Sequence, residues 1–153
     1  MSRPTLWLLV AAAAVFGLQA QPSLAKDAPI YTATFSNAAV GGYDTVAYFT
    51  DHRPVKGDRR FVHGWQGVEW RFVSAENRDR FAAAPERFAP PFRGYCAWAV
   101  SQGYTASGDP QFWKIVDDKL YLNYDADVQK KWEKDIPGFI VKAQQNWPDV
   151  LGK

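Results

Sequence analysis

Cysteine and methionine are almost absent from this chain of 153 residues, which has one of each. With Cys96 alone, no internal disulfide can close the fold. Met1 is the only thioether, so a copper(I) site built from soft ligands would have little besides one thiol. An unpaired cysteine indicates a free thiol or, in a chain that is exported, pairing between two chains. A disulfide-linked dimer through Cys96 therefore stays open.

A large excess of charge of one sign is also missing. The chain has 18 basic and 16 acidic residues, a net charge of +2, and 22% of its residues are charged. Such a balance creates no field for nucleic acid, so we expect no nucleic-acid partner. Because 47% of the residues are hydrophobic and 16% aromatic, the disordered class is excluded as well.

The longest uncharged apolar run, Leu6 to Leu18, is too short to cross a bilayer, which takes about 20 residues. It follows Arg3 and leads to the small residues around Ala25. This pattern predicts a signal peptide, residues 1–25, cleaved near Ala25. We expect one mature domain, residues 26–153, that is periplasmic or secreted and has no stable membrane insertion.

Two hairpins are predicted in the mature chain. Val68, Trp70 and Phe72 alternate with polar residues, as in a half-buried strand. It would pair with residues 61–65 around a turn at Gln66-Gly67, and residues 112–116 would pair with 119–124 around Asp117-Asp118.

Helices are expected to follow each hairpin. Ser74 is a helix N-cap, and Pro85 ends or resets that helix. Asp125 or Asn123 caps the next helix, which we expect to break at Pro137-Gly138. We find no internal repeat. The fold class is α+β, a small and mainly antiparallel sheet with several short helices packed on it. An N-terminal arm, residues 26–37, would be held down by Tyr31 and Phe35.

Several separated blocks of the chain, in this order, resemble the YHS domain, and in particular the exported single-domain YHS proteins of Gram-negative bacteria. The blocks are residues 43–49, 65–77, 81–85, 94–97, 113–116 and 132–138. The resemblance implies the α+β fold above. Some YHS domains accompany heavy-metal pumps, and they are thought to bind metal through two cysteines in a Phe-Cys-Ser-x-x-Cys pattern. Here Val73 and Asn77 stand at those two positions, so that metal site does not carry over.

Cys96 is the centre of the candidate site. Residues 96–100 after Gly94-Tyr95 are expected to begin a helix, whose positive end and nearby Arg93 would favour a thiolate. Some exported relatives are thought to carry selenocysteine, which would suit a redox position. The competing interpretation is a buried cysteine that acts as a small hydrophobe.

The other candidates come from the surrounding residue types. Tyr43, Asp44, Tyr95 and Trp98 could line a ligand pocket with Cys96, although aromatics are also ordinary core residues and Asp44 an ordinary capping residue. His63 could join Cys96 as a metal ligand, for copper or zinc, although the chain has no ligand-spacing motif.

Three functions follow. The first is a periplasmic protein that binds or handles a thiophilic metal ion or small molecule through Cys96. The second is a thiol redox enzyme or sensor at the same residue. The third is a non-catalytic interaction module of the cell envelope. The sequence holds no Ser/His/Asp or Cys/His catalytic signature, so enzymatic activity stays open.

Overall fold

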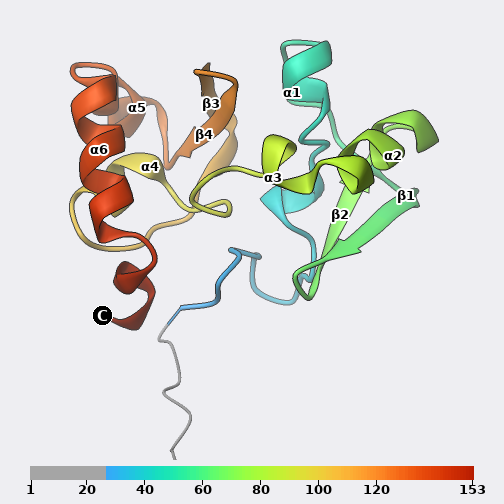
Figure 1. The fold of residues 1–153 in the computed structure, drawn as a ribbon, viewed down its shortest axis with the longest axis horizontal. Coiled ribbons are helices and arrows are strands. Elements are labelled where there is room, and N and C mark those ends of the chain that lie inside the picture. Colours follow the sequence, from blue (N-terminus) through green and yellow to red (C-terminus); the bar gives the residue numbers. More distant parts are fainter. Residues whose placement is uncertain (1–26) are drawn as a thin grey trace, which may run out of the picture.

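A computed structural model describes residues 27–153 of the chain (Figure 1). The predicted signal peptide and its cleavage site lie outside the described residues. The α+β class is confirmed, with the strands arranged as two separate two-stranded antiparallel sheets. In chain order the elements are η1 (Val40–Gly42), α1 (Ala47–Thr50), β1 (Asp58–Trp65), β2 (Val68–Phe72), α2 (Ala75–Ala83), α3 (Pro85–Phe88), α4 (Ala97–Ser101), β3 (Asp109–Val116), β4 (Lys119–Asn123), α5 (Ala126–Trp132), α6 (Ile136–Asn146) and η2 (Asp149–Gly152).

The first hairpin, β1–β2, has the predicted alternation. Trp70 and Phe72 are buried, whereas Glu69 and Arg71 lie on the opposite face. The strands turn at Gln66 and Gly67, whose φ angles are 51° and 80°. Two successive residues with positive φ match the right-handed twist of a two-residue hairpin. The predicted turn is therefore confirmed.

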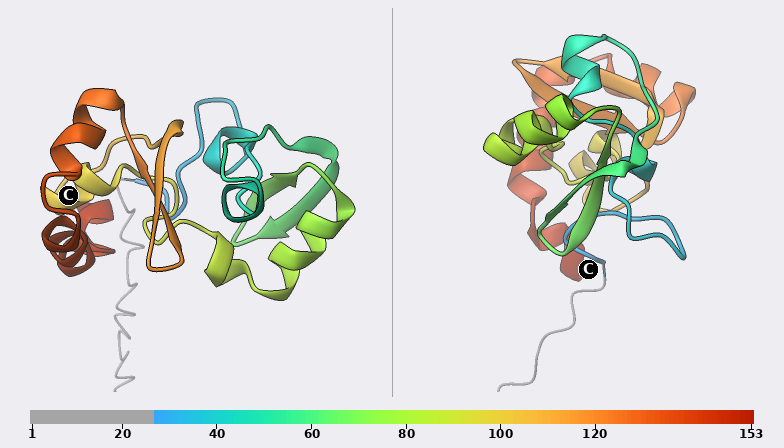
Figure 2. Two further views of the ribbon diagram at one scale, coloured as in Figure 1. Left: turned by 90° about the horizontal axis from the view of Figure 1, so that it is seen from above. Right: turned by 90° about the vertical axis from the view of Figure 1, so that its right-hand side faces the viewer.

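The second hairpin, β3–β4, lies between helices α1–α3 on one side and α4–α6 on the other (Figure 2). It turns at Asp117 and Asp118, with φ angles of 49° and 57°, a region that Asp tolerates better than most residues. Leu120 and Leu122 pack into the core around β1 and β2, and Tyr121 packs into the core around α4 and α6. Because successive side chains of a strand point to opposite faces, β4 joins the two cores.

The expectation that the chain has no internal repeat is wrong for its backbone. In β1–β2, Asp58 pairs with Phe72, a bulge follows, and the pairing then runs on to the turn. In β3–β4, Asp109 pairs with Asn123, followed by a bulge and the same run of pairs. Each pair lies 51 positions further along, from 58 to 109 and from 72 to 123. We call residues 42–88 the first unit and residues 94–139 the second unit.

The loops and caps repeat too. In the first unit, the Gly57 N–H donates to Gly42 O at 2.9 Å; in the second, the Gly108 N–H donates to Gly94 O at 2.9 Å. Further equivalent pairs of residues are the N-caps Ser74 and Asp125, the fully buried Phe81 and Trp132, and the paired bridges Tyr43–Lys56 and Tyr95–Ser107. Few of the matched side chains are identical, which is why the sequence does not reveal the repeat.

Helix boundaries follow the capping residues. Ser74 accepts a hydrogen bond from Asn77 N at 3.2 Å, and Pro85 begins the new helix α3, as predicted. Asp125, rather than Asn123, caps α5. The expected break at Pro137-Gly138 is wrong, because Pro137 lies in the first turn of α6, where its missing N–H costs nothing. The chain instead leaves helical geometry at Asp135, which caps α6.

The arm before the first unit is attached at one of its two predicted residues. Tyr31 packs on Tyr95, with ring centroids 5.5 Å apart. Phe35 does not pack, because it lies in a tight turn with φ of 62° and its side chain is fully exposed. The role predicted for Phe35 is therefore wrong. Within residues 27–153, no helix combines the length and the hydrophobicity needed to cross a bilayer.

Candidate functional site

Cys96 lies where the chain passes from a tight turn into α4. Gly94, with φ of 92°, makes the turn, and Cys96 is the N-cap residue of the helix, as predicted. Its backbone N–H donates to Ala106 O at 2.8 Å, and the residue forms an isolated bridge with Leu122 of β4. These contacts fix the thiol between the start of α4 and the end of the second hairpin.

The sulfur has one polar side chain beside it. Cys96 Sγ lies 3.7 Å from Oδ1 of Asn123, an oxygen that also accepts a bond from Trp98 N at 3.3 Å. Asn123 is fully buried, and its Nδ2 has no hydrogen-bond partner among the described residues. Because the Trp98 N–H bond fixes Oδ1 in place, both N–H donors of the Asn123 amide stay unused within the buried environment of the thiol.

Two opposing effects act on the Cys96 thiol. Burial raises its pKa, while the backbone N–H groups of Ala99, Tyr124 and Trp98 lower it, and the net direction is upward. The thiol is therefore the form that the resting fold favours. Donors that face the sulfur would stabilise negative charge on it whenever a reaction produces that charge.

A cavity of about 190 Å³ opens over the thiol. Cys96 is fully buried at its floor, and Tyr104 and Tyr124 are about half exposed at its rim. Its remaining lining residues are Trp98, Ala99, Ala106 and Val128. Trp98 contacts Tyr104 edge-on, with ring centroids 6.3 Å apart, and Lys131 Nζ lies 5.4 Å from the centroid of the Trp98 ring. The cavity is apolar apart from the sulfur and the tyrosine hydroxyls.

In the first unit, Asp44 occupies the position of Cys96. Its carboxylate is fully buried and accepts four hydrogen bonds, from Val46 N, Ala47 N, Val73 N and Asn77 Nδ2, at 2.8–3.1 Å. The three backbone donors correspond to those that face Cys96, and Asn77 corresponds to Val128. The repeat thus gives each unit the same group of backbone donors, one around a carboxylate and one around a thiol.

The structure brings only some of the predicted site residues together. Trp98 lines the Cys96 cavity, whereas Tyr95 points elsewhere and donates its hydroxyl to Ala28 O at 2.7 Å. Burial raises the pKa of that hydroxyl to about 12. Tyr43 is bonded to Gln111 at 3.2 Å, and Asp44 lies at the equivalent position in the first unit.

His63 does not lie at the Cys96 cavity. It lies on β1 and packs edge-on against Phe81, with ring centroids 5.9 Å apart. Among residues 27–153 no group of three or more His, Cys, Asp and Glu side chains could hold a metal ion.

Five residues of the cavity are absent from the sequence prediction: Ala99, Tyr104, Ala106, Tyr124 and Val128. Tyr104 follows Gly103 in a loop, and Val128 reads as a core residue of α5. These residues come from separate segments of the chain, so their meeting at one cavity could not be predicted from local sequence patterns. Comparisons of the chain with protein-family models, with curated proteins and with solved structures give no match.

Proposed function

We propose that this protein binds a small, largely apolar molecule in the cavity over Cys96. The observation that carries the proposal is the cavity itself, a thiol floor under aromatic walls with two half-exposed tyrosines at its mouth. Single exposed hydrophobic residues are normal, whereas exposed apolar side chains that gather at one opening are typical of ligand-binding grooves. Tyr104 and Tyr124 are two of the five large hydrophobic side chains exposed in residues 27–153, and both lie at this one opening.

The contrast between the units supports a binding role. Asn77 donates to Asp44 in the first unit, whereas Val128 at the equivalent position in the second unit makes no such bond and leaves the cavity next to the sulfur. A fold that needed only a packed core here would have no use for this opening. A small apolar molecule would fill it and displace water from apolar walls.

We also propose that the protein is periplasmic and similar to the exported single-domain YHS proteins. A metal ion at Cys96 would need ligands other than His63, because His63 packs on Phe81 in the first unit. A dimer linked through Cys96 would need the cavity to open, because the thiol is fully buried.

The test is a titration of ¹⁵N-labelled protein with indole as the apolar probe, followed by NMR. We expect saturable shifts at the amides of Ala99 and Tyr124. Val128→Phe fills the cavity while keeping Cys96 in the chain, and should weaken binding at least about tenfold. Val141→Phe is the matched control, because Val141 is an exposed valine on α6. Absence of saturable shifts in the wild type, or equal weakening by both variants, would reject the binding proposal.

Thiol redox chemistry is the second candidate, favoured by the three backbone N–H groups that face the sulfur. In the proposed step, the thiolate attacks one oxygen of an organic hydroperoxide. An S–O bond forms and the O–O bond breaks, and the departing alkoxide takes a proton, which leaves sulfenic acid and an alcohol. Two equivalents of an external thiol would restore the reduced form: the first forms a mixed disulfide with release of water, and the second releases the Cys96 thiol and leaves as the external disulfide.

The redox and metal alternatives are tested on the same protein. Treatment with cumene hydroperoxide and then dimedone should add one dimedone to wild type and none to Cys96→Ala, as read by mass spectrometry. Absence of the adduct in wild type would reject the redox candidate. Equal retention of zinc and copper by wild type and Cys96→Ala would exclude the sulfur from any metal site. If neither indole nor hydroperoxide acts at Cys96, the envelope interaction module remains.

A further inference from the structure

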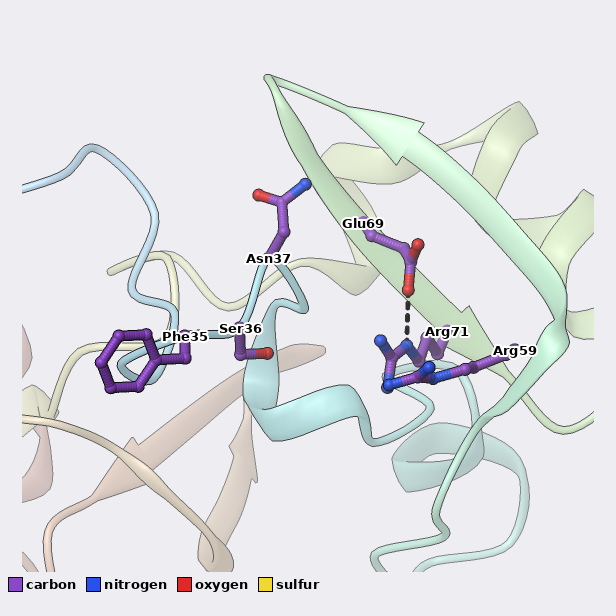
Figure 3. Close-up of a pocket in the computed structure, with 6 residues that line it drawn as sticks. All are labelled: Phe35, Ser36, Asn37, Arg59, Glu69 and Arg71. Carbon is purple, nitrogen blue, oxygen red and sulfur yellow. Dashed lines mark hydrogen bonds and ion pairs between the residues drawn. The ribbon is translucent and has the colours of Figure 1, made fainter.

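A second cavity lies on the first unit, on the face of β2 that points away from the core (Figure 3). Its volume is about 390 Å³. The lining residues are Phe35, Ser36, Asn37, Arg59, Glu69 and Arg71, so it has no residue in common with the Cys96 cavity. Arg59 and Arg71 both line this cavity, and in the view of Figure 3 their side chains overlap on one side of it.

The repeat shows that the fold does not need charge at this face. Glu69 and Arg71 correspond to Leu120 and Leu122 of the second unit, which are buried in the core. The same strand position therefore accepts an apolar residue. An arginine at such a position, with its side chain only 18% exposed, loses hydration and needs another reason to be there.

The backbone makes room for Arg71. A Cβ atom at Gly42 would lie 3.4 Å from both Cδ and Nη1 of Arg71. Gly42 has a φ of 79°, which disfavours a side chain there. Arg71 Nε is bonded to Glu69 Oε1 at 2.6 Å, and this pair fixes the guanidinium over Gly42. The remaining nitrogens of the guanidinium keep their donors for another acceptor.

The loop that forms the other wall is tied to the same strand. The Glu69 N–H donates to Asn37 O at 2.8 Å, and the Ala39 N–H donates to Glu69 O at 2.9 Å. Ser36 Oγ accepts from Ala38 N at 3.1 Å, which leaves its hydroxyl hydrogen available. The cavity is thus a preformed space whose walls offer mostly donors.

The charges in the cavity do not balance. Arg59 makes no ion pair or side-chain hydrogen bond among residues 27–153, and Arg71 is paired with Glu69. Two guanidiniums and one carboxylate leave a net charge of +1. A single negative charge neutralises this set, whereas a dianion would leave an excess. Planar guanidinium donors match the two oxygens of a carboxylate.

We infer that this cavity binds a small organic monocarboxylate between Arg59 and Arg71. Its carboxylate would lie against the two guanidiniums, with Ser36 and Asn37 as further donors. Phe35 lies at the opposite edge of the cavity with its ring turned away from the arginines, and forms part of the rim (Figure 3). The inference is independent of the function proposed for Cys96.

The experiment is a calorimetric titration of the whole protein with benzoate at low salt, with benzyl alcohol as the neutral probe. We expect a dissociation constant on the order of 1 mM for benzoate, weaker binding at higher salt, and no binding of the alcohol. Arg59→Gln should weaken benzoate binding at least about tenfold. Arg60→Gln is the matched control, because Arg60 is paired with Asp58 and does not line the cavity.

Inorganic phosphate distinguishes the charge of the ligand. At equal ionic strength we expect phosphate to bind less tightly than benzoate. Equal or tighter binding of phosphate would overturn the assignment to a monocarboxylate. Lack of benzoate binding, or the same loss in Arg60→Gln as in Arg59→Gln, would overturn the site. Indole shifts at Ala99 and Tyr124 are read separately, so failure here leaves the Cys96 proposal intact.

Discussion

The first unit holds a carboxylate where the second unit holds a thiol. Asp44 is fully buried and accepts four hydrogen bonds, whereas Cys96 faces the three corresponding backbone donors and has a cavity above it. A buried carboxylate with its donors satisfied fixes a loop, a helix start and a strand end at once. The same arrangement in the second unit surrounds a thiol, whose pKa burial raises, so that the fold keeps it protonated. Asp44 is therefore a structural residue, whereas Cys96 is a candidate reactive one.

At the equivalent strand faces of the two hairpins the contrast is reversed, because here the second unit is packed and the first is open. Leu120 and Leu122 are buried in the second unit, whereas Glu69 and Arg71 line an open cavity in the first. Each unit therefore has one packed position and one open position, and the open ones are at different places. Positions where the side chains of the two units differ in burial, although the backbone is the same, are therefore the places where we propose that ligands bind.

The largest expected effect is the loss of the Asp44 carboxylate. Asp44→Ala leaves three backbone N–H groups and the Asn77 amide without their acceptor, so we expect a loss of at least about 3 kcal/mol in the free energy of unfolding. Cys96→Ala removes only a weak hydrogen bond and some packing, and should cost about 1–2 kcal/mol. Urea denaturation of both variants measures the difference. Equal losses would mean that the two positions are not distinguished as described.

The pH dependence of stability sharpens the same comparison. Because burial raises the pKa of Cys96, the folded state favours the protonated thiol. This contribution is complete below about pH 8.5 and is lost as the pH rises further, by at most about 1.4 kcal/mol per pH unit. Denaturation at pH 7 and pH 9.5 should show this loss in wild type, and a smaller one in Cys96→Ala. A wild type that gains stability over this range relative to the variant would reverse the sign assigned to the thiol.

The smallest effect is expected at Phe35, in the loop beside the first unit. A phenylalanine at φ of 62° is strained by about 1 kcal/mol, and its exposed ring recovers no packing energy. Phe35→Gly relieves the strain but gives the unfolded chain more freedom, so we expect a net gain of up to about 0.5 kcal/mol. Thermal melts of this variant and wild type test it. A clear loss of stability would show that the ring makes a contact on which the fold depends.

Much of the local structure follows from the sequence. Alternation in residues 68–72, the cap at Ser74 and the restart at Pro85 each depend on interactions within a few positions, and all three are confirmed. The prediction at Pro137 is wrong because a proline can begin a helix as readily as end one. The prediction at Phe35 is wrong because the residue type alone does not indicate whether a turn directs the side chain into solvent.

The candidate site was only partly accessible from sequence. Cys96 at the start of a helix follows from the residues around it, but the cavity depends on contacts between segments far apart in the chain. The sequence indicates Asn123 only as a candidate helix cap, yet its side chain is fully buried beside the sulfur. The equivalence of Asp44 and Cys96 rests on hydrogen bonds rather than on identical side chains. Periodicity carries no information about such bonds.

The most direct test of the repeat is the stability of Cys96→Asp at pH 7, with Cys96→Leu as the control for size. If the backbone donors of Ala99, Tyr124 and Trp98 form the same group that holds Asp44, the new carboxylate will be accepted. We predict that Cys96→Asp unfolds within about 1 kcal/mol of wild type. A loss of about 3 kcal/mol or more, as expected for a buried charge without donors, would contradict the equivalence of the two units.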